Sequence, residues 1–345
     1  MTVRALLRVV GWNAILILGV LIAAEAVFGD WFRGGGLGVL HIPHDVSLRH
    51  DVSKVRPGGG IARYTRDHWG FRGTQRDPSE IDILAVGGST TNELYHDDSE
   101  TWTAVLQRDF AAAGRKIVVA NAGVDGHSTV GHLRSVEDWF PRVPRLHPKL
   151  ILYYVGINDV YVESQARYDA IVPQGRWERI RRYVSDNSAL YSVVRMVRGM
   201  VLASRARVIY SNDPPKLVPT AATATVRRAG YAARLAAYAA RLRAIAARTR
   251  AFGARPAFVT QRRGDAFVVD GRVMATGAAA VDARAVQDFF NETTMAVCRE
   301  TGSICIDLAA QIELAPADFV DAIHTNPSGS RKIGDYLYRK LKDAL

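Results

Sequence analysis

The chain has 345 residues, 48% of them hydrophobic, which is enough for one large α/β core with additional elements. Its two cysteines exclude a disulfide framework and any zinc site built from several cysteines. The formal charge is +11, and residues 161–263 carry 20 Lys and Arg against 5 Asp and Glu. This excess fits either a solvated helical face or an anionic partner such as a polysaccharide or lipid headgroups. No nucleic-acid-binding motif accompanies it, so we expect no nucleic-acid partner.

The N-terminus carries a long apolar run, residues 9–28, preceded by Arg4 and Arg8. About 20 apolar residues suffice to cross a bilayer as a helix, whereas the apolar region of a signal peptide has roughly 7–15. We therefore expect residues 1–30 to anchor the chain in a cell inner membrane as a single-pass helix. The two arginines favour a cytoplasmic N-terminus, which leaves the rest of the chain outside the cytoplasm, in the periplasm. A signal sequence cleaved near residues 23–26 is the alternative.

Residues 31–80 are interpreted as a connecting region that packs on the core, because glycine clusters interrupt them. Four histidines are scattered through this region, and their spacing fits no standard metal signature. We interpret them as surface or packing residues, and no metal site is expected. They are His41, His44, His50 and His68.

Five short apolar runs predict strands, and several of them are separated by helical patterns. The first three runs each end in a loop that contains glycine and polar residues. This alternation predicts a three-layer α/β/α sandwich with a mainly parallel five-stranded sheet, in which the three loops meet at one edge. The runs cover residues 83–86, 117–120, 150–155, 257–260 and 304–308.

Helices are predicted at residues 101–113, 130–140 and 231–252, and from after residue 329 to Leu345. Residues 160–224 are too long for an ordinary connection and form an Arg-rich helical insertion in the domain 81–345. It includes an apolar helical stretch at 189–201 and a break at 212–215. We expect the insertion to border the edge of the sheet that carries the loops, or to touch a membrane surface.

Two sequence features carry chemistry. Ser89 follows a strand and two glycines, and so occupies a sharp turn at the edge where open α/β sheets bind ligands. Asp321 and His324 are three residues apart, within hydrogen-bonding reach on one turn. In that geometry the carboxylate can orient the imidazole, and the imidazole can take a proton from a serine hydroxyl.

Four blocks in this order resemble the SGNH (GDSL-type) hydrolase superfamily over roughly residues 81–345, with the insertion unmatched. They are residues 87–91, 121–129, 156–159 and 321–324. The resemblance implies a flavodoxin-like fold and a serine esterase that needs no metal or organic cofactor. Ser89 would be the nucleophile, His324 the base and Asp321 its acidic partner. The backbone N–H of Gly126 and the side chain of Asn158 would join the Ser89 N–H in holding the oxyanion.

The sequence departs from the commonest family pattern at Gly88, where most members have aspartate. This aspartate is neither nucleophile nor base, so its loss indicates a divergent subgroup and removes no proposed catalytic group. His127 and His132 lie near the second block and are interpreted as structural. Cys298 and Cys305 are either bridged or two buried thiols.

The preferred function is a membrane-anchored esterase that hydrolyses acyl esters, with O-acetyl groups on an envelope polysaccharide as the expected substrate. An O-acyltransferase with the same triad is one alternative. It would need an acyl donor, such as a partner protein in the envelope membrane that carries the acyl group. A binding or assembly subunit that retains the fold with little activity is the other.

Overall fold

The computed structural model describes residues 3–29, 31, 42–53, 59–73, 77–162, 175–191, 193–194 and 215–345. The chain forms two compact units, one from residues 1–41 and 171–209 and the other from residues 42–170 and 210–345. Each is described by itself. His41, residues 212–214 of the predicted break and residues 195–201 of the predicted apolar helix lie outside the described residues.

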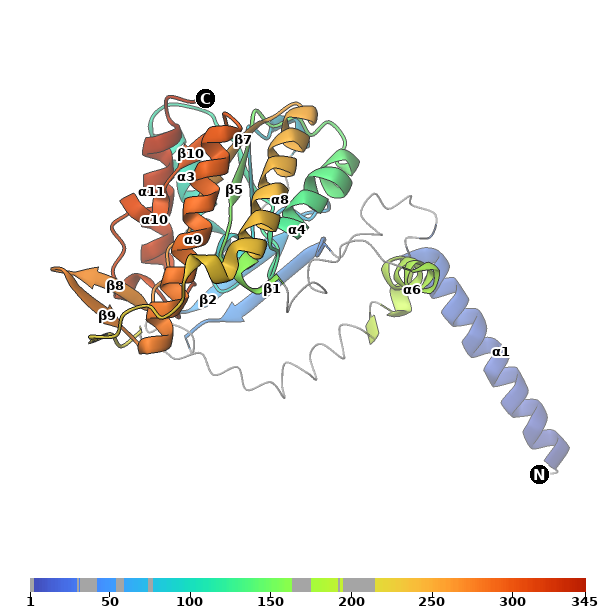
Figure 1. The fold of residues 1–345 in the computed structure, drawn as a ribbon. Coiled ribbons are helices and arrows are strands. Elements are labelled where there is room, and N and C mark those ends of the chain that lie inside the picture. Colours follow the sequence, from blue (N-terminus) through green and yellow to red (C-terminus); the bar gives the residue numbers. More distant parts are fainter. Residues whose placement is uncertain are drawn as a thin grey trace. The chain divides into compact units, whose positions relative to one another are not determined.

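Five parallel strands form the central sheet of the larger unit, in the order β10-β7-β5-β3-β4. Figure 1 labels the first three of them. They match the five predicted strands to within a few residues, so the predicted fold is confirmed. Every residue of β3 is buried, as expected for a strand covered by helices on both faces. The strands are β3 Ile83–Gly87, β4 Val119–Asn121, β5 Leu150–Tyr154, β7 Arg255–Val259 and β10 Ile304–Ile306.

Helices cover both faces of this sheet. One face carries α3 (Trp102–Ala112) and α11 (Pro327–Leu341), and the other carries α4 (Thr129–Arg134), α8 (Ala232–Ala251) and α9 (Ala278–Glu300) (Figure 1). The predicted helices at 101–113 and 231–252 are confirmed. The predicted helix at 130–140 is instead α4 followed by a π-helical turn, Ser135–Trp139, and the C-terminal helix ends at Leu341. The sequence analysis did not identify α9.

Alternation along the strands builds the two halves of the core. Ile83 and Ala85 of β3 belong to a buried cluster with Trp102 of α3 and Ile333 of α11. On the opposite face, the hydroxyl of Tyr153 in β5 forms a 2.7 Å hydrogen bond with Thr249 of α8.

The described part of residues 31–80 is more ordered than a connecting region. It contains an antiparallel hairpin, β1 (Val46–Asp51) with β2 (Ile61–Arg66). A second small sheet pairs β6 (Val218–Pro219), β9 (Arg272–Ala275) and β8 (Ala266–Val269). Two short helices, α2 (Ser89–Asn92) and α10 (Leu308–Gln311), complete the larger unit.

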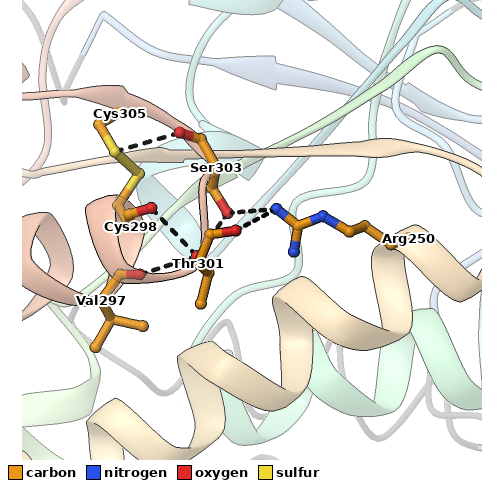
Figure 2. The surroundings of a disulfide bond; sticks show 6 residues. All are labelled: Arg250, Val297, Cys298, Thr301, Ser303 and Cys305. Carbon is orange, nitrogen blue, oxygen red and sulfur yellow. Dashed lines mark hydrogen bonds between the residues drawn. A yellow bond between two sulfur atoms is a disulfide. The ribbon is translucent and has the colours of Figure 1, made fainter.

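A disulfide joins Cys298, at the end of α9, to Cys305 in β10 (Figure 2). This decides between the two alternatives for the cysteines. The turn that it closes is held further by Arg250 of α8, whose guanidinium donates to the Thr301 carbonyl at 2.6 Å. The disulfide thus fixes the connection between a covering helix and an edge strand of the sheet.

The smaller unit contains α1 (Val3–Phe28) and α6 (Arg176–Asn187), with further helical residues at 189–191. Among the described residues, Arg8–Phe28 is the one helical segment long and apolar enough to cross a membrane, and none of it is buried. It coincides with the predicted anchor, although a signal sequence passes the same test.

Candidate active site

The turn after β3 brings Ser89 to the carboxyl edge of the sheet. A side chain on Gly87 would collide with Thr91, because its Cβ would lie 2.1 Å from the threonine Oγ1. A Cβ on Gly88 would lie 2.3 Å from Nδ2 of Asn158. The two glycines therefore allow a bend in which β3 passes directly into α2, with Ser89 as the first residue of that helix.

Ser89, His324 and Asp321 form one hydrogen-bonded chain, although 235 residues separate the serine from the histidine. The Ser89 hydroxyl lies 2.8 Å from Nε2 of His324. Nδ1 of the same ring lies 2.7 Å from Oδ2 of Asp321. Both distances fall in the range required for a base and its orienting carboxylate.

The local turn fixes the position of Asp321. Its Oδ1 accepts the backbone N–H groups of Ile323 and His324, both at 2.8 Å, while Oδ2 accepts the His324 ring. Burial alone would raise the pKa of the Asp321 carboxyl, but these hydrogen bonds and the charge of His324 together lower it below its usual value. The carboxylate is thus ionised and directed at the imidazole at neutral pH.

Gly126 and Asn158 lie beside Ser89, on the loops after β4 and β5. Gly126 lines the same cavity as Ser89 and has a φ of +76°, which favours glycine. Asn158 donates one Nδ2 hydrogen to the carbonyl of His127 at 2.9 Å. This bond fixes the orientation of the amide, whose second hydrogen can then donate to a bound oxygen atom.

A cavity of about 290 Å³ opens over the Ser89 hydroxyl. The loop after α2 and the turn before α11 supply its apolar lining, while Asp125, Asn326 and the Ser89–His324–Asp321 chain make part of it polar. The apolar residues are Leu94, Tyr95, Val320 and Pro327. A site with this composition suits a small molecule that has an apolar portion and a polar bond to be cleaved.

The family of the chain can be assigned from its sequence. Residues 85–271, more than half of the chain, match the GDSL-like lipase/acylhydrolase family. The chain belongs to this family. It is therefore an acylhydrolase of the esterase type, and the resemblance seen in its motifs is confirmed. No curated protein matches the chain.

Solved structures similar to this acylhydrolase include TesA, with 17% identity over 76% of this chain and 99% of TesA, at a TM-score of 0.45. The psychrotrophic esterase EstA from Pseudoalteromonas sp. is 15% identical over 76% of this chain and 97% of EstA, at a TM-score of 0.43. Axe2, an acetylxylan esterase from Geobacillus stearothermophilus, is 16% identical over 77% of this chain and 96% of Axe2, at a TM-score of 0.44.

In this acylhydrolase a buried ion pair ties the loops of Gly126 and Asn158 together. Asp159, next to Asn158, accepts the backbone N–H and the hydroxyl of Thr129, close to Gly126. Arg241 of α8 lies 3.1 Å from the same carboxylate and donates to the Thr129 hydroxyl at 2.7 Å. Because Asp159 is fully buried and paired, we infer that it holds the loops rather than acting on the substrate.

The histidines of the second block are buried and neutral. Burial, with a smaller contribution from Arg66, lowers the pKa of His127 to about 3. Burial also lowers the pKa of His132 well below its usual value. His127 contributes its backbone carbonyl to the orientation of Asn158, and its ring remains uncharged at neutral pH.

Two histidines of the region before the sheet are brought together. Nδ1 of His44 and Nδ1 of His68 lie 2.9 and 3.0 Å from the same oxygen of Asp45. All three side chains are partly or largely exposed. Each ring nitrogen is placed to donate a hydrogen bond to this carboxylate oxygen.

Sequence analysis missed two buried arginines that support the turn of Ser89. Arg72 donates to the backbone carbonyls of Asn92, Glu93 and His96, with distances of 2.5 Å to Glu93 and 2.6 Å to His96. Arg66 donates to the Asn92 side chain at 2.8 Å and to the Gly123 carbonyl. The sequence predicted that this region packs on the core before the first predicted strand, but it gave no signal that these guanidinium groups are buried.

Glu93 is the second feature that the sequence did not reveal. It lines the cavity, is fully buried, and has a φ of +51° at the end of α2. Its carboxyl accepts the Trp102 N–H at 2.9 Å and the Ser330 hydroxyl. Burial raises its pKa to about 7 despite these hydrogen bonds and the charge of Arg72.

Proposed function

We propose that the chain is a serine esterase in which Ser89 is the nucleophile, His324 the general base and Asp321 the residue that orients His324. The observation that carries this proposal is the continuous hydrogen-bonded chain from Ser89 Oγ through both nitrogens of His324 to Asp321, at 2.8 and 2.7 Å.

The reaction proceeds in two acyl transfers. His324 Nε2 takes the hydroxyl proton as Ser89 Oγ attacks the ester carbonyl, which forms a tetrahedral oxyanion. The N–H groups of Ser89 and Gly126 and the Asn158 amide hold this oxyanion, and each such donor typically contributes about 3–4 kcal/mol. His324 then gives its proton to the leaving alcohol, and the C–O bond breaks. Water, deprotonated by His324, releases the acid and regenerates Ser89, so the cycle needs no metal or organic cofactor.

The substrate is an acyl ester, with O-acetyl groups on an envelope polysaccharide as our specific proposal. The cavity supports the first part, because its apolar lining beside Ser89 suits an acyl group. For the second part, α1 anchors the catalytic unit at the outer face of the inner membrane. Arg4 and Arg8 precede the apolar segment, and the Cys298–Cys305 bridge is typical of an oxidising compartment.

The test compares wild type with Ser89→Ala in the full chain, purified in detergent. We would measure p-nitrophenyl acetate hydrolysis and labelling by a fluorophosphonate probe. Ser47→Ala, on the exposed surface of β1, is the matched control. We expect turnover and labelling to vanish in Ser89→Ala and to persist in Ser47→Ala. A folded wild-type protein that neither labels nor turns over would disprove the esterase mechanism.

The same assay separates hydrolysis from acyl transfer. An esterase turns over steadily in buffer and is indifferent to added sugar. A transferase would show an acyl-enzyme burst followed by slow release, and a sugar acceptor would accelerate that release.

A further inference from the structure

A carboxylate near the outer end of α1 is fully engaged in hydrogen bonds. Glu25 lies one turn before the end of the apolar segment Arg8–Phe28. It accepts the hydroxyl of Ser188 and the backbone N–H groups of Ala189 and Leu190, both at 3.1 Å. The Trp31 indole donates to the same carboxylate at 2.8 Å.

These bonds join α1 to the helical insertion within the smaller unit. Residues 189–191 are helical, so Glu25 satisfies the free N–H groups at the start of that helix, as a capping side chain does. Trp31 also packs edge-on against Tyr183 of α6, with ring centroids 5.8 Å apart. The end of α6 and the helical residues after it are therefore attached to the last turn of α1 (Figure 1).

The side chains of α6 that the structure describes include an exposed apolar face. Trp177, Ile180, Tyr183 and Val184 are all exposed, Trp177 at 81%. At 3.6 residues per turn these four positions fall within about a third of the helix circumference, which also contains the two end residues Arg176 and Asn187. Beyond α6, Val193 and Val194 are exposed at 53% and 63%. Apolar side chains grouped in this way on one helix face indicate an apolar environment against that face.

The net positive charge of α6 favours a lipid surface as the apolar environment. Its twelve residues include four arginines and two acidic residues. A helix with aromatic and aliphatic residues on one face and arginines in its sequence has the composition of helices that lie in the plane of a bilayer surface. Its attachment to the last turn of a membrane-spanning helix places it at the depth of the headgroups.

We propose that α6 and the helical residues after it lie in the membrane interface, with the apolar face in the acyl boundary and the arginines among anionic lipid headgroups. Glu25 is the positioning residue that holds this helical arm against the outer end of α1. The proposal rests on the membrane-spanning role of α1 given above, and it goes further by assigning a lipid surface as the partner of the insertion.

The test uses the full chain reconstituted in vesicles of phosphatidylethanolamine and phosphatidylglycerol. Trp177→Cys is labelled with an environment-sensitive fluorophore, and the native cysteines are bridged and unreactive. Val268→Cys, at an exposed apolar position in the larger unit, is the control. We expect brominated lipid to remove most of the emission at position 177 and little at position 268. Replacing Glu25→Leu should reduce the quenching at 177.

Retention of the protein after alkaline carbonate extraction reports separately on the span. Protein that is extracted would refute the anchor, and with it the premise of the interfacial arm. Protein that is retained but shows equal, weak quenching at 177 and 268 would refute the interfacial arm alone. If the label is shielded in native membranes but not in vesicles that contain this chain as their one protein, another protein covers this face and the lipid proposal is wrong.

Discussion

The side-chain amide of Asn158 occupies the space that a side chain at position 88 would need. A Cβ on Gly88 would lie 2.3 Å from Asn158 Nδ2 and 3.1 Å from the His127 carbonyl that orients this amide. The commonest family pattern has aspartate at this position. In this chain the departure is coupled to the position of a proposed oxyanion donor.

Gly88→Ala should therefore impair catalysis more than stability. Asn158 must swing away, and the loss of one oxyanion donor typically lowers kcat about 10²–10³-fold. We expect a decrease of that order with a melting temperature close to wild type, because the close contact is with a side-chain end and the His127 carbonyl, at 3.1 Å, has to move only slightly. Gly230→Ala is the control, since a Cβ there meets nothing within 4 Å. Unchanged kcat in Gly88→Ala would contradict the role of Asn158.

Arg72→Lys should slow turnover while leaving substrate binding nearly intact. A lysine ammonium cannot reproduce the fork of donors that reaches the carbonyls of residues 92, 93 and 96. We expect kcat to fall about tenfold, with little change in KM, and the free energy of unfolding to fall by about 2–4 kcal/mol. Kinetics normalised to the fluorophosphonate-labelled fraction would measure kcat and KM, and denaturant unfolding would measure the free energy of unfolding. Arg63→Lys, exposed on β2, should behave as wild type.

Glu93 predicts a specific pH dependence of stability. Its pKa is about 7 in the folded chain and 4.5 in its ordinary state, so folding takes up a proton between these values. The uptake of this proton adds about 3 kcal/mol to the free energy of unfolding. This contribution is complete below about pH 4.5 and is lost as the pH rises through 7. Glu93→Gln, which cannot ionise, should remove this part of the decline.

Melting temperatures measured from pH 4.5 to pH 8 would test this. Glu80→Gln, at an exposed position, is the control and should keep the wild-type profile. Parallel profiles for wild type and Glu93→Gln would mean that the carboxyl keeps its charge when buried.

Breaking the disulfide should lower stability without changing the site. The bridge closes a loop with a sequence separation of 7, and loop-closure entropy for this length corresponds to about 2–3 kcal/mol. The double variant Cys298→Ser, Cys305→Ser should melt a few degrees lower and keep wild-type kcat. Dithiothreitol should lower the melting temperature of wild type and have no effect on the double variant.

The sequence predicted the five strands because each is a short apolar run that ends in glycine or polar residues, a local pattern. It also predicted that Ser89 and the pair Asp321 and His324 would share a site, because strand ends of a parallel sheet meet at one edge. The structure brings these residues within hydrogen-bonding distance. Their catalytic roles remain the proposal that the variants above test.

The buried supports of the site could not be predicted. Arg66 and Arg72 are residue types usually exposed, and their partners are mostly backbone carbonyls, which carry no sequence signal. Glu93 follows the polar residues 89–92, which predict an exposed turn. Its burial depends on Trp102 and Ser330, residues near in space but distributed along the chain. The buried face of helix α9 contains polar as well as apolar residues, so its sequence lacks a clear helical pattern of apolar positions.

The two guanidinium groups that hold the turn of Ser89 come from residues 66 and 72, ahead of the stretch by which the family is recognised. That stretch starts at residue 85, whereas the compact unit starts at residue 42. A protein that began at residue 85 would keep Ser89 and lose both arginines that hold its turn. We therefore expect a shortened protein to fold and act only if it includes the residues from about 42 onward, well ahead of the stretch that matches the family.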